Sequence, residues 1–193
     1  MLFRSGHSVL WLDQVEPGKR PFYPVVDEVR SRLGELRTEW ALKARNYQFF
    51  PNMQFNDSVT TMLRVFRPLS VDLTEMNTYC LAPIGERADL RAWRLRQFED
   101  FFNPSGMATP DDTVTYEDCQ LGFSGRGLEW LQGYERGLEA LAQVPNEVAK
   151  EIDIRPSQNI IGTIEMQQEV AMEAPYREWA RMMEAGLAGR NPY

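Results

Sequence analysis

The feature that most constrains the fold is a change in hydrophobic period along the chain. Apolar and polar residues alternate over residues 47–50 and 59–66 and again over 74–81, whereas the flanking segments carry apolar residues at three- and four-residue spacing. The first pattern is typical of strands and the second of amphipathic helices. Pro68 and Asp72 predict a turn before the last alternating segment, and hence a hairpin of antiparallel strands. Helices on either side of this hairpin indicate an α+β domain.

The remaining elements are expected from the same spacing and from the chemistry of helix starts. Thr109 and Pro110, followed by two acids, predict the first turn of a helix. The other predictions, in chain order, are a strand at 8–12, a helix at roughly 25–44, a helix at 86–102, a glycine-rich loop at 122–137 and an irregular or strand segment at 152–162.

A long helix is expected to close the chain. One face of this helix carries Met172, Tyr176, Trp179 and Met183 at helical spacing, and Pro175 either kinks it or marks its start. The order of elements predicts a single domain for the 193-residue chain. In this domain a curved antiparallel sheet packs against the long carboxy-terminal helix.

The amino-acid composition indicates which partners the chain can bind and in which cell compartment it is found. The chain has 21 Lys plus Arg against 28 Asp plus Glu, a formal charge of -7, which argues against a nucleic-acid partner. No apolar stretch reaches the roughly 18 residues of a membrane span, and no signal peptide is recognisable, so no membrane contact is expected. Cys80 and Cys119 are interpreted as reduced thiols, which favours a cytoplasmic location.

The count of metal-binding residues excludes several kinds of site. The chain contains one histidine, His7, and its two cysteines are 39 positions apart in sequence (119 minus 80). These counts exclude a self-contained zinc finger, a four-ligand iron–sulfur cluster and any site that needs two histidines. His7 also has no serine or cysteine partner in a triad pattern. Chemistry in this chain therefore uses carboxylates, or takes ligands from elsewhere.

The first candidate site is the pair of acids Asp111 and Asp112. After a proline-rigidified turn, one of two adjacent carboxylates can point inward as a hard oxygen ligand or general base while the other stays solvated. Both acids also suit the positive end of a helix dipole, and composition alone favours that interpretation.

Further candidates are an amide and a group of apolar side chains. Asn46 enters an otherwise apolar strand, where it either binds a ligand or satisfies a neighbouring backbone group. Phe101, Phe102 and Met107 either line an apolar pocket beside the acids or form plain core.

Several separate segments of the chain resemble the same protein family, and the longest of them runs from Arg94 to Asp112. The others are Gly6-His7, Arg45-Asn46, Phe50-Pro51-Asn52, residues 64–68, residues 81–83, residues 117–120 with Gly122, Trp130, Arg136-Gly137 and the helix of Tyr176 and Trp179. Together they resemble the large (α) subunits of Rieske-type aromatic-ring-hydroxylating dioxygenases, especially the benzoate, toluate and anthranilate 1,2-dioxygenase branch. The likeness covers nearly the whole chain.

The resemblance implies a catalytic domain of the helix-grip (START-like) type, whose antiparallel sheet curls around a mononuclear iron(II). Two histidines and one aspartate hold the iron in that family. The aspartate is the second acid of the pair and corresponds to Asp112, which is the implied catalytic residue. Asn46 and Phe102 correspond to substrate-pocket positions, Met107 lies beside them, and Ala108 stands where some relatives carry a bulky aromatic residue.

The implied activity is cis-dihydroxylation of a benzoate-like aromatic acid, using dioxygen and electrons from NADH. The implied partners are a reductase component, a small β subunit and further large subunits, in a hexamer of both subunits or a trimer of large subunits. The implied cofactors are the mononuclear iron(II) and, in the complete subunit, a [2Fe-2S] Rieske cluster.

One departure from the family is large. The two iron-binding histidines and the Rieske domain have no counterpart in this chain, and His7 matches a downstream Gly-His pair of the family rather than a ligand. The chain therefore resembles the carboxy-terminal part of such a subunit and is expected to be inactive alone. The alternative is a non-catalytic helix-grip domain that binds a small aromatic ligand or assembles with an intact oxygenase.

Overall fold

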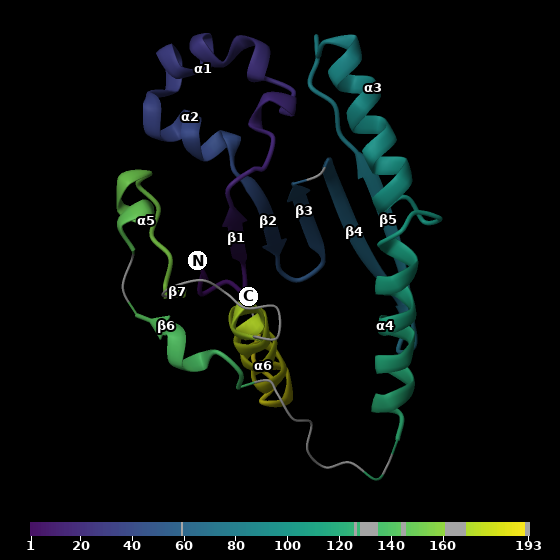
Figure 1. Ribbon diagram of the computed structural model, residues 1–193. Helices are drawn as coiled ribbons and strands as arrows, with labels where there is room; N and C mark the ends of the chain where they lie inside the picture. Colours follow the sequence, from purple (N-terminus) through teal and green to yellow (C-terminus); the bar gives the residue numbers. More distant parts are fainter. Residues whose placement is uncertain (59, 126, 128–134, 144–145, 161–168, 192–193) are drawn as a thin grey trace. The chain divides into compact units, whose positions relative to one another are not determined.

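The computed structural model describes residues 1–58, 60–125, 127, 135–143, 146–160 and 169–191 (Figure 1). The chain divides into two compact units. Unit 1 contains Met1–Leu10, Asn46–Gln54 and Leu131–Tyr193, and unit 2 contains Trp11–Arg45 and Phe55–Trp130. Val59, Trp130 and residues 161–162, which were part of the sequence predictions, lie outside the described residues.

A five-stranded sheet places its strands in chain order, from β1 to β5. The strands are β1 (Ser8–Leu12), β2 (Ala44–Phe49), β3 (Met53–Asp57), β4 (Thr61–Ser70) and β5 (Leu73–Cys80). The predicted hairpin is confirmed, because β4 and β5 pair antiparallel with Met62 opposite Cys80. The predicted turn lies later than expected, since β4 continues through Pro68, where the register shifts before Ser70. Such an irregularity tolerates a residue that lacks a backbone N–H.

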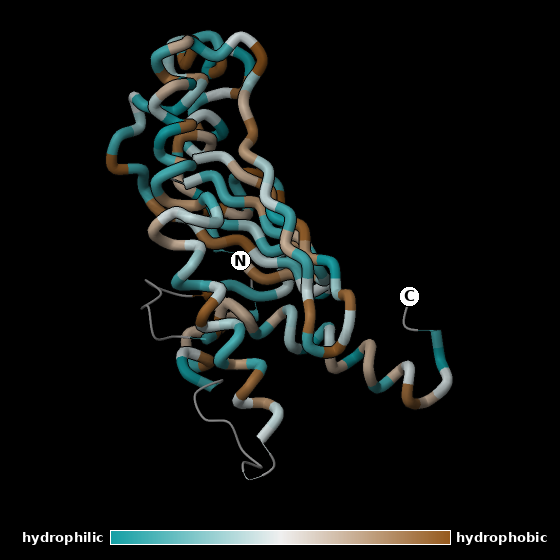
Figure 2. The backbone as a smooth tube through the Cα atoms, turned by 90° about the vertical axis from the view of Figure 1, so that its right-hand side faces the viewer, coloured by the Kyte–Doolittle hydropathy of each residue, from teal (hydrophilic) through white to brown (hydrophobic). Residues whose placement is uncertain are grey.

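The side chains of Met62 and Arg64, near the start of β4, belong to the covered face of this hairpin. Met62 and Arg64 are buried, with relative exposures of 3% and 4%, and they alternate with less buried neighbours. Figure 2 shows hydrophilic and hydrophobic residues mixed along the strands, as a sheet with two different faces requires. In unit 2, α3 (Ala88–Gln97) and α4 (Thr109–Phe123) lie along β4 and β5 (Figure 1).

The helix predictions are confirmed in position and corrected in detail. The segment expected as one helix at 25–44 is two helices, α1 (Val26–Leu33) and α2 (Glu35–Leu42), because Gly34 has a φ of +79°. A positive φ is incompatible with a continuous right-handed helix and is readily adopted by glycine. The segment at 86–102 is α3 followed by a π-helical turn, η3 (Phe98–Phe102).

The later helices also match their predicted positions. α4 begins at Thr109 as expected and continues to Phe123 through Gly122, which the sequence placed in a pliable stretch. α6 (Glu173–Leu187) is the predicted closing helix, and Pro175 lies in its first turn rather than at a kink. The short elements are η1 (Pro17–Lys19), η2 (Tyr23–Val25), η4 (Leu138–Ala140), β6 (Leu141–Ala142), α5 (Glu147–Glu151), β7 (Asn159–Ile160) and η5 (Val170–Met172).

In unit 1, α6 packs closely against the turn that contains Gly6. A Cβ atom on Gly6 would lie 2.7 Å from Cγ of Phe50 and 3.0 Å from Cβ of Glu178, and Gly6 has a φ of +80°. The Nδ1 atom of His7 accepts a hydrogen bond from the backbone N–H of Phe50 at 3.0 Å. The only histidine is therefore part of the packing of this turn. Among the described residues, no helix has the length and apolar character that crossing a membrane requires.

Candidate functional site

A tight loop in unit 2 connects the π-helical turn η3 to α4. The N–H of Met107 donates to the O of Asp100 and the N–H of Ala108 donates to the O of Phe101, each at 2.9 Å. A Cβ atom on Gly106 would lie 2.7 Å from the carbonyl O of Phe101, too close for any side chain to be accommodated without backbone movement. The loop is therefore fixed by its backbone, and it determines where α4 begins.

Arg64 of β4 joins the start of α4 to the sheet. Its Nη2 donates to Oγ1 of Thr109 at 2.9 Å, and its Nη1 lies 3.4 Å from Oδ2 of Asp112. Thr109 in turn donates to the backbone O of Phe102 at 2.8 Å. The strand, the π-helical turn and the helix thus meet at the hydroxyl of Thr109, and Asp112 follows three residues later in the first turn of α4.

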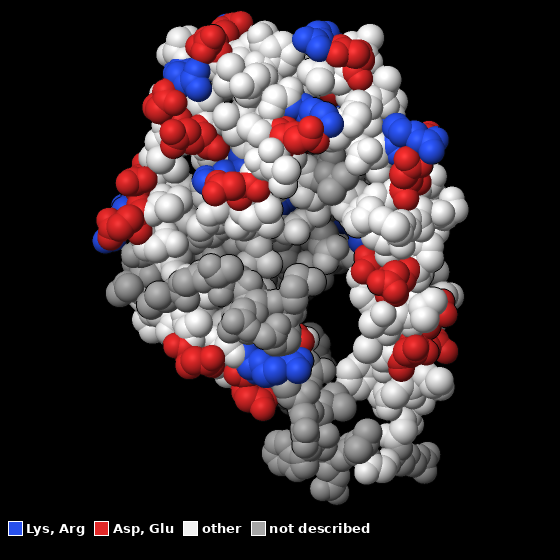
Figure 3. Space-filling view, viewed as in Figure 1, with Lys and Arg blue, Asp and Glu red and all other residues white. Residues whose placement is uncertain are grey.

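The two charged side chains of this contact, Arg64 and Asp112, differ in how deeply they are buried. The side chain of Arg64 is 5% exposed, whereas that of Asp112 is 43% exposed. Burial, and then the negative charge of Asp112, raise the pKa of Tyr116, while Arg64 acts in the opposite direction. Figure 3 shows acidic side chains along α4, whose sequence contains no lysine or arginine. The carboxyl group of Asp112 is therefore partly open to solvent beside a buried cation.

The structure brings together three of the predicted site residues. Phe102 is 8% exposed, and its ring lies 5.7 Å from the Arg64 guanidinium carbon. Ala108 immediately precedes α4, and Met107 beside it is 73% exposed. Phe102, Ala108 and Asp112 thus belong to one neighbourhood in unit 2.

Asn46 belongs to unit 1, and the positions of the two units are described separately. It is exposed on β2. Its predicted role in a substrate pocket therefore stays a prediction.

The sequence predictions did not identify Arg64 as a site residue. Its signal in the sequence is an arginine between Met62 and Phe66, at the same two-residue spacing as these apolar side chains. A charged residue at an inward strand position is rarely buried without a specific partner. The alternating pattern thus identified the strand, but it did not show that the buried Arg64 belongs to the candidate site.

The residues present fit an iron site in part. A half-exposed carboxylate such as Asp112 is a hard oxygen donor suited to iron(II). No group of three or more His, Cys, Asp or Glu residues in the described part of the chain is arranged to hold a metal ion. The described residues thus offer one ligand of a facial triad, and they do not complete the triad.

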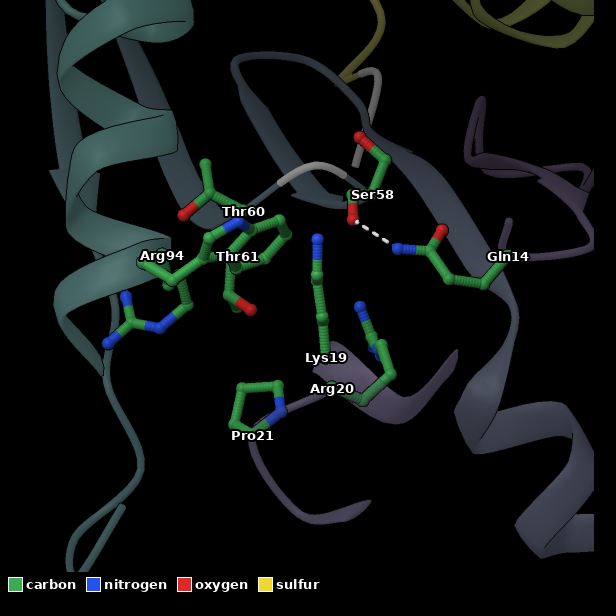
Figure 4. Close-up of a pocket in the computed structure, with 9 residues that line it drawn as sticks. Gln14, Lys19, Arg20, Pro21, Ser58, Thr60, Thr61 and Arg94 are labelled. Carbon is green, nitrogen blue, oxygen red and sulfur yellow. Dashed lines mark hydrogen bonds between the residues drawn. The ribbon is translucent and has the colours of Figure 1, made fainter. Parts of the chain in front are cut away.

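A separate polar hollow in unit 2 lies among Gln14, Lys19, Thr60, Trp93 and Arg94 (Figure 4). Gln14 donates to the backbone O of Ser58 at 3.1 Å, and the Lys19 ammonium lies 4.8 Å from the centre of the Trp93 ring. The hollow has room for about one water molecule. Its size suits ordered water rather than an aromatic substrate.

A buried ion pair and a buried cluster of three charged residues lie beside this hollow, which Arg94 and Arg20 line. Arg94 binds Glu86 through two hydrogen bonds, of 3.0 Å and 2.6 Å, and both side chains are at most 3% exposed. Asp57 binds Arg20 and also Arg45, the latter at 2.5 Å. Burial alone would raise the pKa of Asp57, but hydrogen bonds and charge from the two arginines outweigh it and lower this pKa. These arginines serve the packing of unit 2.

The sequence matches a family model and several curated proteins. Residues 3–185 match the family model described as "Ring hydroxylating alpha subunit (catalytic domain)". Toluate 1,2-dioxygenase subunit alpha of Pseudomonas putida is 39% identical over 182 residues, which cover 94% of this chain and 38% of that protein. Anthranilate 1,2-dioxygenase large subunit of Acinetobacter baylyi is 36% identical over 187 residues, which cover 96% and 39%. The 2-halobenzoate 1,2-dioxygenase large subunit of Burkholderia cepacia is 35% identical over 186 residues, again 96% and 39%.

Solved structures show the same fold. Naphthalene 1,2-dioxygenase with indole bound aligns with a TM-score of 0.66 and 17% identity, covering 99% of this chain and 42% of that one. The α+β fold with an antiparallel sheet is thereby confirmed. The chain spans about two fifths of the length of the curated relatives it matches. With the family model matched over nearly all of its length, the chain belongs to the catalytic-domain family of ring-hydroxylating α subunits.

Proposed function

We propose that this chain forms the part of an oxygenase large subunit that supplies Asp112 as the carboxylate ligand of a mononuclear iron(II). The complete enzyme would cis-dihydroxylate a benzoate-like aromatic acid with dioxygen and electrons from NADH. The observation that carries the proposal is the half-exposed Asp112 carboxylate on the first turn of α4, in a chain of this family. Three relatives are named as dioxygenases of ring acids, which supports an acidic aromatic substrate.

Each residue of the site would have a distinct task. When bound, iron(II) supplies the activation of dioxygen. Asp112 would provide one anionic ligand, and the two histidines would come from outside the described residues. Phe102 and Met107 would offer apolar surface to the ring, the small side chain of Ala108 would leave space beside it, and Asn46 would hydrogen-bond the substrate.

The partners of this function follow from its chemistry. Electrons from NADH would reach the iron through a reductase and a [2Fe-2S] Rieske cluster, so both must belong to the complete system. We propose a cytoplasmic assembly of large subunits, with or without small β subunits. The described residues of this chain contain no group that would transfer these electrons, since the cluster needs cysteine and histidine ligands.

A second candidate function is binding without catalysis. The incomplete ligand set of the described residues favours it, because one carboxylate holds iron(II) only weakly. In this case the chain binds a small aromatic acid, or assembles with an intact oxygenase.

The test uses the isolated chain and a chimera. The isolated chain should contain well under one iron per molecule and form no diol with reductase and NADH. In the chimera, this chain replaces the matching 38% of the Pseudomonas putida toluate 1,2-dioxygenase α subunit, and the remaining components are those of that enzyme. The chimera should convert a benzoate-like acid to its cis-diol, measured by product analysis and NADH consumption.

The outcomes separate the two candidates. A folded, cluster-containing chimera that forms no diol from any of the ring acids contradicts the enzymatic function. If the isolated chain then binds benzoate in calorimetry, the binding function is supported. Absence of heat at millimolar benzoate contradicts the binding of a small aromatic acid by the isolated chain.

A further inference from the structure

The positive charge of Arg64 faces a much more exposed carboxylate than the charges of Arg20 and Arg94, the other buried arginines of unit 2. Arg20 and Arg94 contact carboxylates whose side chains are 7% and 1% exposed. The carboxylate nearest to Arg64 is that of Asp112, which is 3.4 Å away and 43% exposed. A buried guanidinium with so open a counter-charge contributes little to stability in that form. Its geometry therefore points to a role beyond packing.

The contacts of Arg64 define how Asp112 is presented. One nitrogen of the guanidinium binds the Thr109 hydroxyl in the first turn of α4, and another faces Oδ2 of Asp112. The ring of Phe102 lies against the same guanidinium. The structure gives no hydrogen-bond partner to Oδ1 of Asp112 among the residues it describes. One carboxylate oxygen is thus held by Arg64 and the other is left available to a ligand.

We infer that Arg64 is a positioning residue for Asp112, which restricts the carboxylate so that Oδ1 serves as the metal ligand. The inference rests on the proposed function of Asp112. Hydrogen-bond partners of metal ligands orient them, and their loss usually weakens metal binding about 10- to 100-fold. The planar guanidinium engages Thr109 and Asp112 together, which the single ammonium of a lysine does not reproduce.

The experiment uses the full 193-residue chain and Mn(II) as the probe. Mn(II) prefers carboxylate oxygens, and its paramagnetism broadens nearby NMR signals even when binding is weak. All variants carry Asp111→Asn, so that the neighbouring acid does not contribute. Broadening of the amide signals of residues 109–116 is then followed against Mn(II) concentration.

Arg64→Lys and Arg64→Met should each weaken this binding about tenfold. The pair of variants separates position from charge. Arg64→Met removes a positive charge that repels the metal, so a purely electrostatic role predicts tighter binding in Arg64→Met and unchanged binding in Arg64→Lys. Equal weakening in both variants is expected only for positioning.

Two further variants protect the test from misfolding. Thr109→Val removes the hydroxyl that Arg64 binds and should weaken Mn(II) binding, whereas Thr109→Ser should retain it. Arg67→Met is the matched control, since Arg67 is 65% exposed on the same strand and pairs with Glu75. It should leave Mn(II) binding unchanged.

Two outcomes overturn the inference, and they have different consequences for the ligand role of Asp112. If Mn(II) broadens residues 109–116 equally with and without Arg64, Asp112 remains a ligand and Arg64 does not position it. If the Asp111→Asn chain with Arg64 intact shows no broadening there, the inference fails, and the iron content of the Asp112→Asn chimera decides separately whether Asp112 is a ligand.

Discussion

Asp112→Asn in the chimeric oxygenase should reduce diol formation at least about 100-fold and lower the iron content of the purified protein. Asparagine has nearly the shape of aspartate, so the hydrogen bond between Arg64 and Thr109 at the start of α4 should survive. What is lost is the negative charge that, under the proposed function, binds iron(II), and the remaining amide oxygen is a much weaker ligand. Product analysis and metal content by mass spectrometry measure the two effects.

Asp111→Asn is the matched control for this prediction. It removes the same charge from the same helix turn, one residue away, at an exposed position. If the acids only complement the helix dipole, both variants should have similarly small effects of less than about 1 kcal/mol on stability and none on iron. An Asp112→Asn chimera with normal iron and turnover would falsify the ligand role.

Asp57→Asn should lower the free energy of unfolding by about 3 to 5 kcal/mol. Asp57 is the shared counter-charge of Arg20 and Arg45, whose side chains are 6% and 15% exposed. Its carboxylate also accepts a hydrogen bond from Thr61 at 2.9 Å. Removing the charge leaves two guanidinium groups in the interior without compensation. Urea unfolding measured by circular dichroism gives the change.

The stability that Asp57 contributes should decrease at acidic pH. Because the pKa of Asp57 is lowered in the folded chain, its stabilising effect is fully present above about pH 3.9 and is lost as the pH falls through the lowered value. Asp89→Asn is the control, since Asp89 pairs with Arg87 at the surface and should change stability little. Equal effects of the two substitutions would contradict the role of the buried cluster.

A further variant separates charge from volume. Replacing Asp57 by leucine together with Arg20 and Arg45 by methionine removes all three buried charges at once. Buried ion pairs are often replaced by apolar side chains without loss of stability. This triple variant should therefore be more stable than Asp57→Asn alone.

The sequence predicted those parts of the fold that depend on local chemistry. The hairpin of β4 and β5 follows from alternation, and the start of α4 follows from the threonine, proline and acids at residues 109–112. The break at Gly34 and the π-helical turn at Phe98–Phe102 were missed, because hydrophobic spacing continues across both. β3 was missed because its alternating segment, residues 53–56, is short and is flanked by residues typical of turns, Pro51-Asn52 and Asp57-Ser58.

The candidate site could be predicted only in part, for a physical reason. Asp112 is a single acid in a charged sequence, and the resemblance to a family, rather than its spacing, selected it. Arg64 lies 48 positions earlier in the sequence, and the interaction between the two exists only because the hairpin and α4 pack together. Local patterns carry no information about such a long-range pair. Phe102 and Ala108 were found because they lie in the same continuous stretch as Asp112.

The loop before α4 also has a consequence for how such a site can diversify. Its path is set by main-chain hydrogen bonds and by Gly106, and none of these depends on the side chains of Met107 or Ala108. The position of the carboxylate and the shape of its surroundings are therefore specified by different atoms. Under the proposed function, substitutions at residues 107 and 108 would alter which ring is accepted while Asp112 stays in place, so selectivity would change without loss of the chemistry.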